Sequence, residues 1–256
     1  MDDVTLAQTM NRLTAWMDSR CRPTGFIQHS FERAPLGTTY VCISPREDGP
    51  YASSNHNRVH LCVARLTELF VEAGVGRFFA WLSPGPDMAE VRSWLVDAGL
   101  SRVPYVAYPT LVRDTSEPSV VTTDLEVREL AAGEAGQLAG RLDEVAWPEY
   151  LRSAGAPGFY HFMAFDRGQP VASAVLCAFA GVGYLRMALT AESARRRGAQ
   201  QALIAKRIEK ARALGATTIV SETLSILPIS LSNLRKAGFQ PLYEKEVYQT
   251  NPVERV

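Results

Sequence analysis

One passage constrains the fold of this chain more than any other: a β-type run that leads through a basic turn into a long amphipathic helix. The run ends at Thr190, and the turn that follows contains Arg195-Arg196-Arg197-Gly198. The helix beginning there carries one apolar stripe, made of Ile204, Ile208, Ala211 and Leu214. Unpaired backbone N–H groups, the positive end of a helix dipole and three guanidinium groups meet at such a turn. The passage therefore predicts a site for a phosphate or pyrophosphate at the start of the helix.

The distribution of charge along the chain indicates whether the anion is a small molecule or a polymer. The chain has 256 residues, 46% of them hydrophobic, and a formal net charge of zero, as expected for a soluble globular protein. Between positions 195 and 212, however, Glu209 is the single acid among Arg195, Arg196, Arg197, Lys206, Arg207, Lys210 and Arg212. One basic spot on a neutral protein favours a small anionic ligand and argues against nucleic acid or membrane as a partner.

Cysteine and histidine spacing indicates a cytoplasmic protein without a metal. The four cysteines, Cys21, Cys42, Cys62 and Cys177, lack metal-type spacing, and we expect them to be reduced thiols. His56 and His60 lie four apart without the HExxH pattern of a zinc site. No apolar run approaches the roughly 18 residues that span a bilayer, and the N-terminus has no basic-then-apolar leader.

The order of elements divides the chain into two α/β halves. The first half is predicted to hold helices at 4–20, 59–73 and 88–97 and strands at 25–31, 38–44, 77–82 and 103–112. The second is predicted to hold helices at 133–145, 198–214 and 230–237 and strands at 125–130, 160–165, 171–179, 182–190, 217–222 and 242–250. A polar stretch without helical period separates them, so we expect domains at 1–113 and 125–256 with a linker at 114–124.

The two halves also overlay. Residues 63–82 align without gaps with residues 204–223, which indicates two related units in tandem. The alternative is that the order helix, glycine, strand is common to unrelated α/β proteins. The counterpart of the basic turn is Ser54-Asn55-His56-Asn57, which has neither arginine nor glycine. The second half is therefore predicted to hold the ligand, and the first to be degenerate.

With these elements in order, the second half resembles the GNAT superfamily of acetyl-CoA-dependent N-acyltransferases. The family signature Q/R-x-x-G-x-G/A matches at Arg195 and Gly198, although Gln200 stands at the final Gly/Ala position. A helix ending in Ala-Gly-Phe before the last strand is a second family element, found here at 233–239. The resemblance covers about 125–250 and implies two tandem GNAT-like domains, each an α/β (α+β) fold with a mixed, mostly antiparallel central sheet flanked by helices.

The same resemblance implies how acetyl-CoA is bound. The amides from Arg196 to Ala202 would hold the CoA pyrophosphate, and Leu189 and Thr190 would pair with the pantetheine arm. Asn233 is placed to reach the same arm. The implied CoA-binding set is Leu189, Thr190, Arg195, Arg196, Arg197, Gly198, Ala199, Gln200, Gln201, Ala202 and Asn233.

Catalytic residues do not follow from the family pattern, because two expected groups are missing. Leu234 stands where many members have a tyrosine acid, and residues 184–190 contain no carboxylate base. Glu222, at the end of a predicted strand, is either the base or a solvated strand-end acid; Asp143 and Glu144 are further options. The thiolate could be protonated by Tyr184, Tyr243 or Tyr248, each of which could equally be a packing residue.

The acceptor is predicted to be a primary amine of a small molecule or amino acid, acetylated by direct attack in a ternary complex. Aromatic and acidic side chains at Asp143, Glu144, Trp147 and Tyr150 would suit a cation, and His161 points either into this pocket or outward. A non-catalytic acyl-CoA-binding or regulatory module and a protein N-acetyltransferase are the alternatives. The protein is expected to be a monomer or a homodimer.

Overall fold

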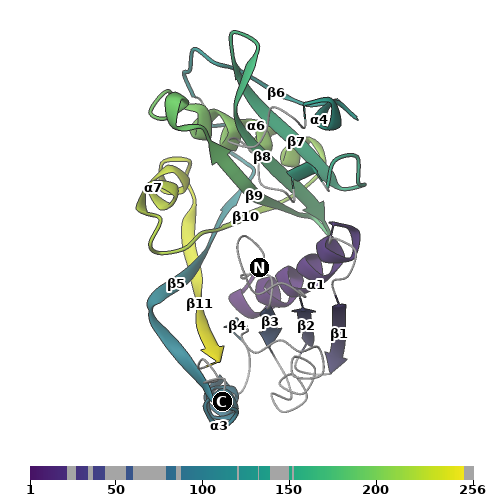
Figure 1. The fold of residues 1–256 in the computed structure, drawn as a ribbon, viewed down its shortest axis with the longest axis vertical. Helices are drawn as coiled ribbons and strands as arrows, with labels where there is room; N and C mark the ends of the chain where they lie inside the picture. Colours follow the sequence, from purple (N-terminus) through teal and green to yellow (C-terminus); the bar gives the residue numbers. More distant parts are fainter. Residues whose placement is uncertain are drawn as a thin grey trace, which may run out of the picture. The chain divides into compact units, whose positions relative to one another are not determined.

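The computed structural model describes residues 1–21, 27–33, 37–43, 56–59, 79–84, 88–119, 121–131, 133–138, 150–151 and 153–250. It contains two compact units, drawn in Figure 1. Unit 1 consists of Met1–Pro109, Leu224–Ile226 and Tyr243–Val256, and unit 2 of Thr110–Thr223 and Leu227–Leu242. Each unit thus takes residues from both halves of the sequence. The domain limits expected at 113 and 125 stay a prediction.

Unit 1 is a sheet with a helix packed on it. Its elements are α1 (Asp3–Cys21), β1 (Ile27–Arg33), β2 (Gly37–Ile43), β3 (His56–Val59), β4 (Phe79–Leu82), α3 (Met88–Asp97), most of β5 (Leu100–Asp114) and the end of β11 (Gln240–Thr250). The strand order is β1-β2-β3-β4-β11-β5, with β3 and β4 parallel. Of the helix predicted at 59–73, the structure describes only Val59, which is the last residue of β3; residues 60–73 lie outside the described part of the chain.

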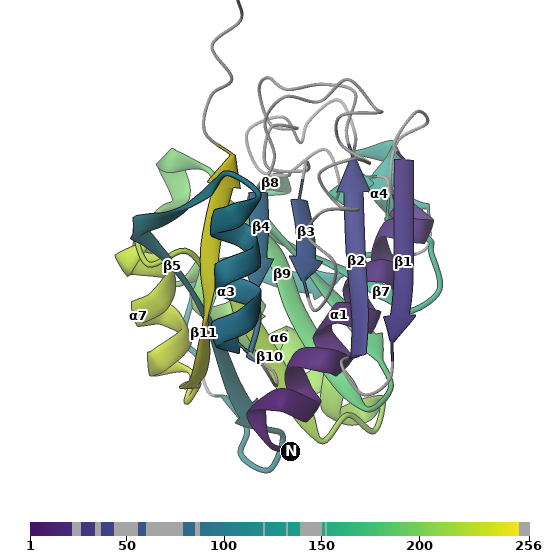
Figure 2. The same ribbon diagram turned by 90° about the horizontal axis from the view of Figure 1, so that it is seen from below.

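Helix α1 is stabilised by a capping residue at its N-terminus and by apolar residues at helical spacing. Asp2 caps it by accepting the Thr5 N–H at 2.8 Å, and Leu6, Met10, Leu13 and Met17 recur at helical spacing. These four side chains are buried, and the helix contacts β1 and β2 (Figure 2). Helix α3 is tied to β11 by Arg92, which donates to both carboxylate oxygens of Glu246.

Unit 2 is a mixed sheet with helix α6 packed on it. Its elements are the end of β5, β6 (Glu126–Glu129), α4 (Glu134–Gln137), β7 (Phe159–Asp166), β8 (Gln169–Phe179), β9 (Val182–Thr190), the 3₁₀ turn η3 (Glu192–Ala194), α6 (Ala199–Ala213), β10 (Thr218–Glu222), α7 (Pro228–Lys236) and the start of β11. The order is β5-β10-β9-β8-β7-β6, antiparallel except for β9 beside β10. The predicted α/β class with a mostly antiparallel sheet is confirmed.

Residues Asp166-Arg167-Gly168-Gln169, a sequence typical of a hairpin turn, connect β7 and β8. Arg167 and Gly168 take φ values of 49° and 77°, the pair of positive angles that a two-residue type I′ turn requires. The turn aligns Phe159–Asp166 against Gln169–Cys177 and so sets which side chains of β8 face α6.

The predicted apolar stripe of the second half packs α6 against the sheet. Ile204, Ile208 and Ala211 are buried with Leu203 in one cluster with strand residues such as Leu185 and Ile219. Leu214 departs from the prediction. The helix ends at Ala213, and Leu214 at its C-cap is 43% exposed.

Helix α6 packs against β9 without room for a side chain at Gly183, and this generates a stability prediction. A Cβ at Gly183 would lie 2.8 Å from the Ala211 Cβ. Gly183→Ala is expected to lower the free energy of unfolding by ~1–3 kcal/mol through overpacking. Ala211→Gly alone should cost about 1 kcal/mol of helix propensity. The double variant should cost less than the sum of the two, because the glycine at 211 clears the space. Urea unfolding of the four proteins measures this, and strict additivity would contradict it.

Candidate functional site

Strands β9 and β10 run together and then part. Their parallel register extends from Val182↔Thr218 to Leu185↔Ser221, while β9 continues to Thr190. The Ser221 hydroxyl donates to the Leu185 carbonyl at 3.2 Å, at the last pair. The burial of β9 changes at the same place, from fully buried through Leu185 to half-buried from Arg186 onward. The last five residues of β9 thus have no register partner in β10.

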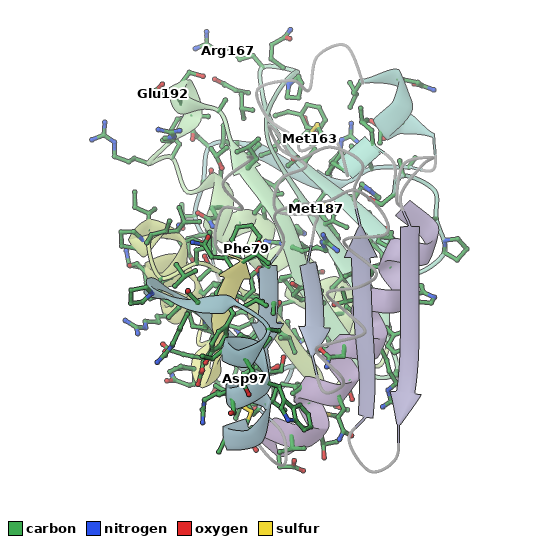
Figure 3. All side chains as sticks on the ribbon, turned by 60° about the horizontal axis from the view of Figure 1, so that its bottom comes forward. Phe79, Asp97, Met163, Arg167, Met187 and Glu192 are labelled. Atoms are coloured by element: carbon green, nitrogen blue, oxygen red, sulfur yellow. The ribbon has the colours of Figure 1, made fainter. Side chains whose placement is uncertain are left out.

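A β-bulge lies just beyond this parting. Val175 pairs with Arg186 and Ser173 with Leu189, so Ala174 of β8 faces two residues of β9, Met187 and Ala188. Met187 takes a left-handed φ of 52°, which costs energy for a residue with a Cβ and is typical of functional sites. Met187 and Glu192, which bracket the end of β9, are labelled in Figure 3. The bulge reorients the peptide groups of β9 just beyond its last register pair with β10.

The two predicted catalytic residues meet at the parting of the strands. The Tyr184 hydroxyl donates to Glu222 Oε2 at 2.9 Å, and the Thr110 hydroxyl donates to Glu222 Oε1 at 3.0 Å. Tyr184 is 5% exposed, Thr110 is fully buried, and Glu222 is half-buried. Glu222 is therefore not a freely solvated strand-end acid, because both of its oxygens accept hydroxyl protons. Thr110 was not predicted, since it lies more than 100 positions earlier and only the β5–β10 pairing brings it here.

The predicted anion-binding turn offers unpaired backbone N–H groups. Helix α6 begins at Ala199 after Gly198, which takes φ 80° and provides no side-chain cap. Among the described residues, no protein group accepts a hydrogen bond from the N–H groups of residues 196–201; Ala202 is the first to bond, to Gly198. A Cβ at Gly198 would lie 3.1 Å from the Thr122 carbonyl, so glycine is required by both space and φ. Successive free N–H groups at a helix start form an anion-binding concavity.

The three arginines of the turn have different surroundings. Arg197 donates to Asp124 at 2.5 Å and to Asp166 at 2.7 Å, and these hydrogen bonds lower the pKa of both carboxyls. Arg195 lies 3.6 Å from Glu192 at the surface. Arg196 is exposed, takes a left-handed φ of 63° and has no acidic partner within the described part of the chain. Arg196 is thus the guanidinium of the turn that is available to an external anion.

Asn233 joins the first turn of α6 to α7. Its Nδ2 donates to Gln200 Oε1 at 2.6 Å, and Gln201 donates to Asn233 Oδ1 at 3.0 Å and to its backbone carbonyl at 2.8 Å. Gln200 therefore fits the position where the family has Gly or Ala, because its side chain turns toward α7. The contact of Asn233 with CoA stays a prediction. Leu234, at the family's tyrosine position, is buried in the core.

The predicted acceptor residues are only partly placed. Asp143, Glu144 and Trp147 lie outside the described residues. Tyr150 is fully buried, with its hydroxyl donated to the Phe162 carbonyl at 3.2 Å and its ring against His161. His161 points inward: its Nε2 lies 2.9 Å from both the Ser153 hydroxyl and the Tyr150 carbonyl. Tyr150 is thus a core residue as it stands, and its substrate contact stays a prediction.

The other two tyrosines considered as acids, Tyr243 and Tyr248, both belong to unit 1 and are both buried. Tyr248 donates to Glu246 at 3.1 Å in the cluster with Arg92. Cys177 is a buried thiol in β8 that forms no disulfide. Of the counterpart turn in the first half, His56 and Asn57 are described, and both lie in β3.

The described residues hold neither a cluster of metal ligands nor a membrane-spanning helix. No group of three or more His, Cys, Asp or Glu side chains is arranged to hold a metal ion. Within the same ranges, no helix has the length and apolar character needed to cross a bilayer.

Burial of His161 predicts a pH-dependent stability. Loss of solvation lowers the pKa of His161 in the folded protein below its ordinary value of 6.5. The unfolded chain therefore binds more protons as the pH falls below about 6.5, and the folded state loses stability in that range. His161→Gln should lose less stability between pH 8 and pH 5 than the unaltered protein. Thermal unfolding at both pH values tests this; an equal loss in the two proteins would contradict it.

Comparisons with known proteins agree with this geometry. Residues 125–239 match the model of the acetyltransferase (GNAT) family. A GCN5-related N-acetyltransferase from Kribbella flavida aligns over 97% of this chain and 96% of its own, with a TM-score of 0.66 and 16% identity. A tandem GNAT protein from the clavulanic acid biosynthesis pathway aligns over 98% of both chains, with a TM-score of 0.64 and 12% identity. A GCN5-related N-acetyltransferase from Sphaerobacter thermophilus aligns over 90% of this chain and 78% of its own, with a TM-score of 0.53 and 12% identity.

At these identities the solved structures establish the fold, and no curated protein matches the sequence significantly. The family match covers the elements from β6 to the end of α7, which include the parted strands, the bulge and the turn before α6. At residues 125–239, the chain therefore carries an acyltransferase domain of the acetyltransferase (GNAT) family.

Proposed function

We propose that the protein transfers the acetyl group of acetyl-CoA to a primary amine of a small molecule or amino acid, by direct attack in a ternary complex. The observation that carries this proposal is the Tyr184–Glu222 hydrogen bond at the point where β9 leaves β10. A proton acceptor and a proton donor in contact, beside the part of β9 that extends past its last pair with β10, match what acyl transfer to an amine needs.

The CoA moiety would extend from the α6 turn along β9. The N–H groups of residues 196–201, which no described residue accepts, would face the pyrophosphate, and Arg196 would add a charge-assisted hydrogen bond. The N–H of Ala202, predicted as a further donor, is instead donated to the Gly198 carbonyl. Leu189 and Thr190, beyond the last β9–β10 pair, would offer their backbone to the pantetheine arm. This path places the thioester near the bulge at Met187 and Ala188.

The reaction would form a carbon–nitrogen bond and break the carbon–sulfur bond. Backbone N–H groups of the bulged end of β9 would hold the carbonyl oxygen as it becomes an oxyanion. Glu222 would take the proton released by the attacking amine. Tyr184 would give its proton to the leaving thiolate and recover one from Glu222 through the existing hydrogen bond. One proton thus moves in total from amine to thiol, and both side chains return to their starting states.

Thr110 would keep this exchange aligned. Its hydroxyl occupies Oε1 of Glu222 and leaves Oε2 to Tyr184, so the carboxylate has a defined orientation. Proton transfer is thus assigned to Glu222 and Tyr184, and stabilisation of the oxyanion to the backbone of β9. The proposed mechanism therefore requires no charged pocket around the acyl group.

Variants of the pair test the mechanism. Glu222→Gln is expected to lower kcat ~10²- to 10³-fold with acetyl-CoA affinity unchanged, because general-base contributions are of this size. Tyr184→Phe should lower kcat by a smaller factor, and the double variant should lose little more than Glu222→Gln, because the two act on one proton path. CoA release with acetyl-CoA and an amine panel gives kcat, and calorimetry gives affinity.

The exposed strand acid Glu244, changed to Gln, is the matched control and should retain wild-type turnover. Acetyl-CoA binding without CoA release for any amine would instead support a non-catalytic acyl-CoA-binding module. Release with peptides alone would indicate a protein N-acetyltransferase.

The arginines of the turn generate a second prediction. Arg196→Ala should weaken CoA binding ~10-fold or more, the value of one charge-assisted hydrogen bond, without changing the unfolding temperature. Arg197→Ala should instead lower the unfolding temperature slightly, because it removes the ion pairs with Asp124 and Asp166 at the surface. Calorimetry with CoA and thermal unfolding separate the two effects. Equal CoA affinity in Arg196→Ala and the unaltered protein would refute the assignment.

A further inference from the structure

Arg207 is a buried cation that the proposed reaction does not yet use. The sequence places it among the basic residues of α6, yet its side chain is 2% exposed and lies in the core of unit 2. None of the described carboxylates pairs with it. A buried charge without a counter-ion is costly, so its retention calls for a reason beyond packing.

Backbone carbonyls replace the missing carboxylate. Nε of Arg207 donates to the Leu203 carbonyl at 3.0 Å, one turn back in α6. Nη1 donates to the carbonyls of Val175 in β8 and Arg186 in β9, each at 3.3 Å. The guanidinium therefore joins α6 to two neighbouring strands through main-chain oxygens.

The two strand carbonyls belong to one register pair. Val175 and Arg186 are the last partners before the bulge, and the next residue of β9 is Met187 with its left-handed φ. Arg207 thus binds β8 and β9 on one side of the bulge, next to Met187. The strained backbone of Met187 must be stabilised by its surroundings.

The bond to Arg186 also acts on the peptide unit that follows. The carbonyl of Arg186 and the N–H of Met187 are the two ends of one peptide group. A cationic donor on the oxygen draws electron density from the nitrogen and makes that N–H a stronger donor. The polarised group lies within the stretch that parts from β10.

From these contacts we infer that Arg207 is a positioning residue for acyl transfer. It fixes the bulge of β9 and polarises the Arg186–Met187 peptide, so that the N–H groups of the bulged stretch are preorganised for the acyl carbonyl oxygen. This inference rests on the proposed acetyl-CoA-dependent function. The family signature does not include this position, and Arg207 acts through the backbone without touching the substrate.

The test reads the acyl carbonyl directly, without requiring turnover. Acetyl-CoA labelled with ¹³C at the carbonyl is bound to the unaltered protein, Arg207→Met and Arg207→Lys, and the carbonyl chemical shift is compared with that of free acetyl-CoA. Met keeps the unbranched stem as far as the position of Nε, without donors or charge. Lys keeps the charge, but its single nitrogen cannot reproduce the spaced donors of the guanidinium.

In the unaltered protein the bound carbonyl should move downfield, as a polarised carbonyl does. Arg207→Met should lose at least about half of this displacement and ~10-fold or more of kcat, the scale of a weakened oxyanion donor. CoA affinity should stay within about twofold, since the α6 turn is untouched. Arg207→Lys should fall between the two. Arg212→Met, an exposed arginine of the same helix, is the matched control and should behave as the unaltered protein.

The other possible results can be told apart. A folded Arg207→Met with an unchanged carbonyl shift would show that the arginine only fills the core. If Arg207→Met does not fold, Arg207→Lys decides: partial loss of the displacement supports the inference, and an unchanged shift refutes it. An unaltered protein that binds no acetyl-CoA would refute the proposed function together with the inference. An unaltered protein that shifts the carbonyl without turnover would leave the role of Arg207 standing and refute catalysis.

Discussion

The parting of β9 from β10 after the Leu185–Ser221 pair is the constraint on which the rest of the site depends. Up to that pair the strands share a ladder and are buried; beyond it, β9 keeps β8 as its neighbour on one side. Strand edges in a sheet interior are normally paired, because unpaired peptide groups are costly. An edge opened in mid-sheet is therefore a place for an extended ligand. At the last β9–β10 pair the Ser221 hydroxyl donates to the Leu185 carbonyl. The hydrogen-bonded pair of Tyr184 and Glu222 is adjacent to these residues in the two strands.

Arginines support this arrangement in three separate ways. Arg197 ties the turn before α6 to Asp124 and Asp166, and so holds the free N–H groups in place. Arg196, without an acidic partner among the described residues, is left for an anion. Arg207 turns inward and binds the carbonyls beside the bulge. The three side chains are identical, and their surroundings alone make Arg197 a structural contact of the turn, leave Arg196 available to an anion and make Arg207 a core cation.

Much of unit 2 was predictable from local patterns. The 166–169 hairpin, the stripe of Ile204, Ile208 and Ala211, and the glycine before α6 each follow from short-range rules that the structure obeys. Tyr184 and Glu222 were predicted individually, but their hydrogen bond was not. Thr110 and the inward turn of Arg207 were missed, since nothing near either residue in the sequence signals its partner. The exposure of Leu214 was also not predicted, because apolar periodicity does not show at which residue a helix ends.

The mostly antiparallel α/β class was expected from the family resemblance. By itself, the local sequence determined the order of elements in the described part of unit 2 and the turn before α6 that is predicted to bind an anion. These depend on turn residues, alternation and helical spacing, which act over a few positions. The tertiary structure alone decided which strand lies beside which, where β9 leaves β10, and that Thr110 meets Glu222 across the sheet. It also decided that Arg207 is buried. The physical reason is that strand pairing and burial depend on residues far apart in the chain, and local patterns carry no record of those distant partners.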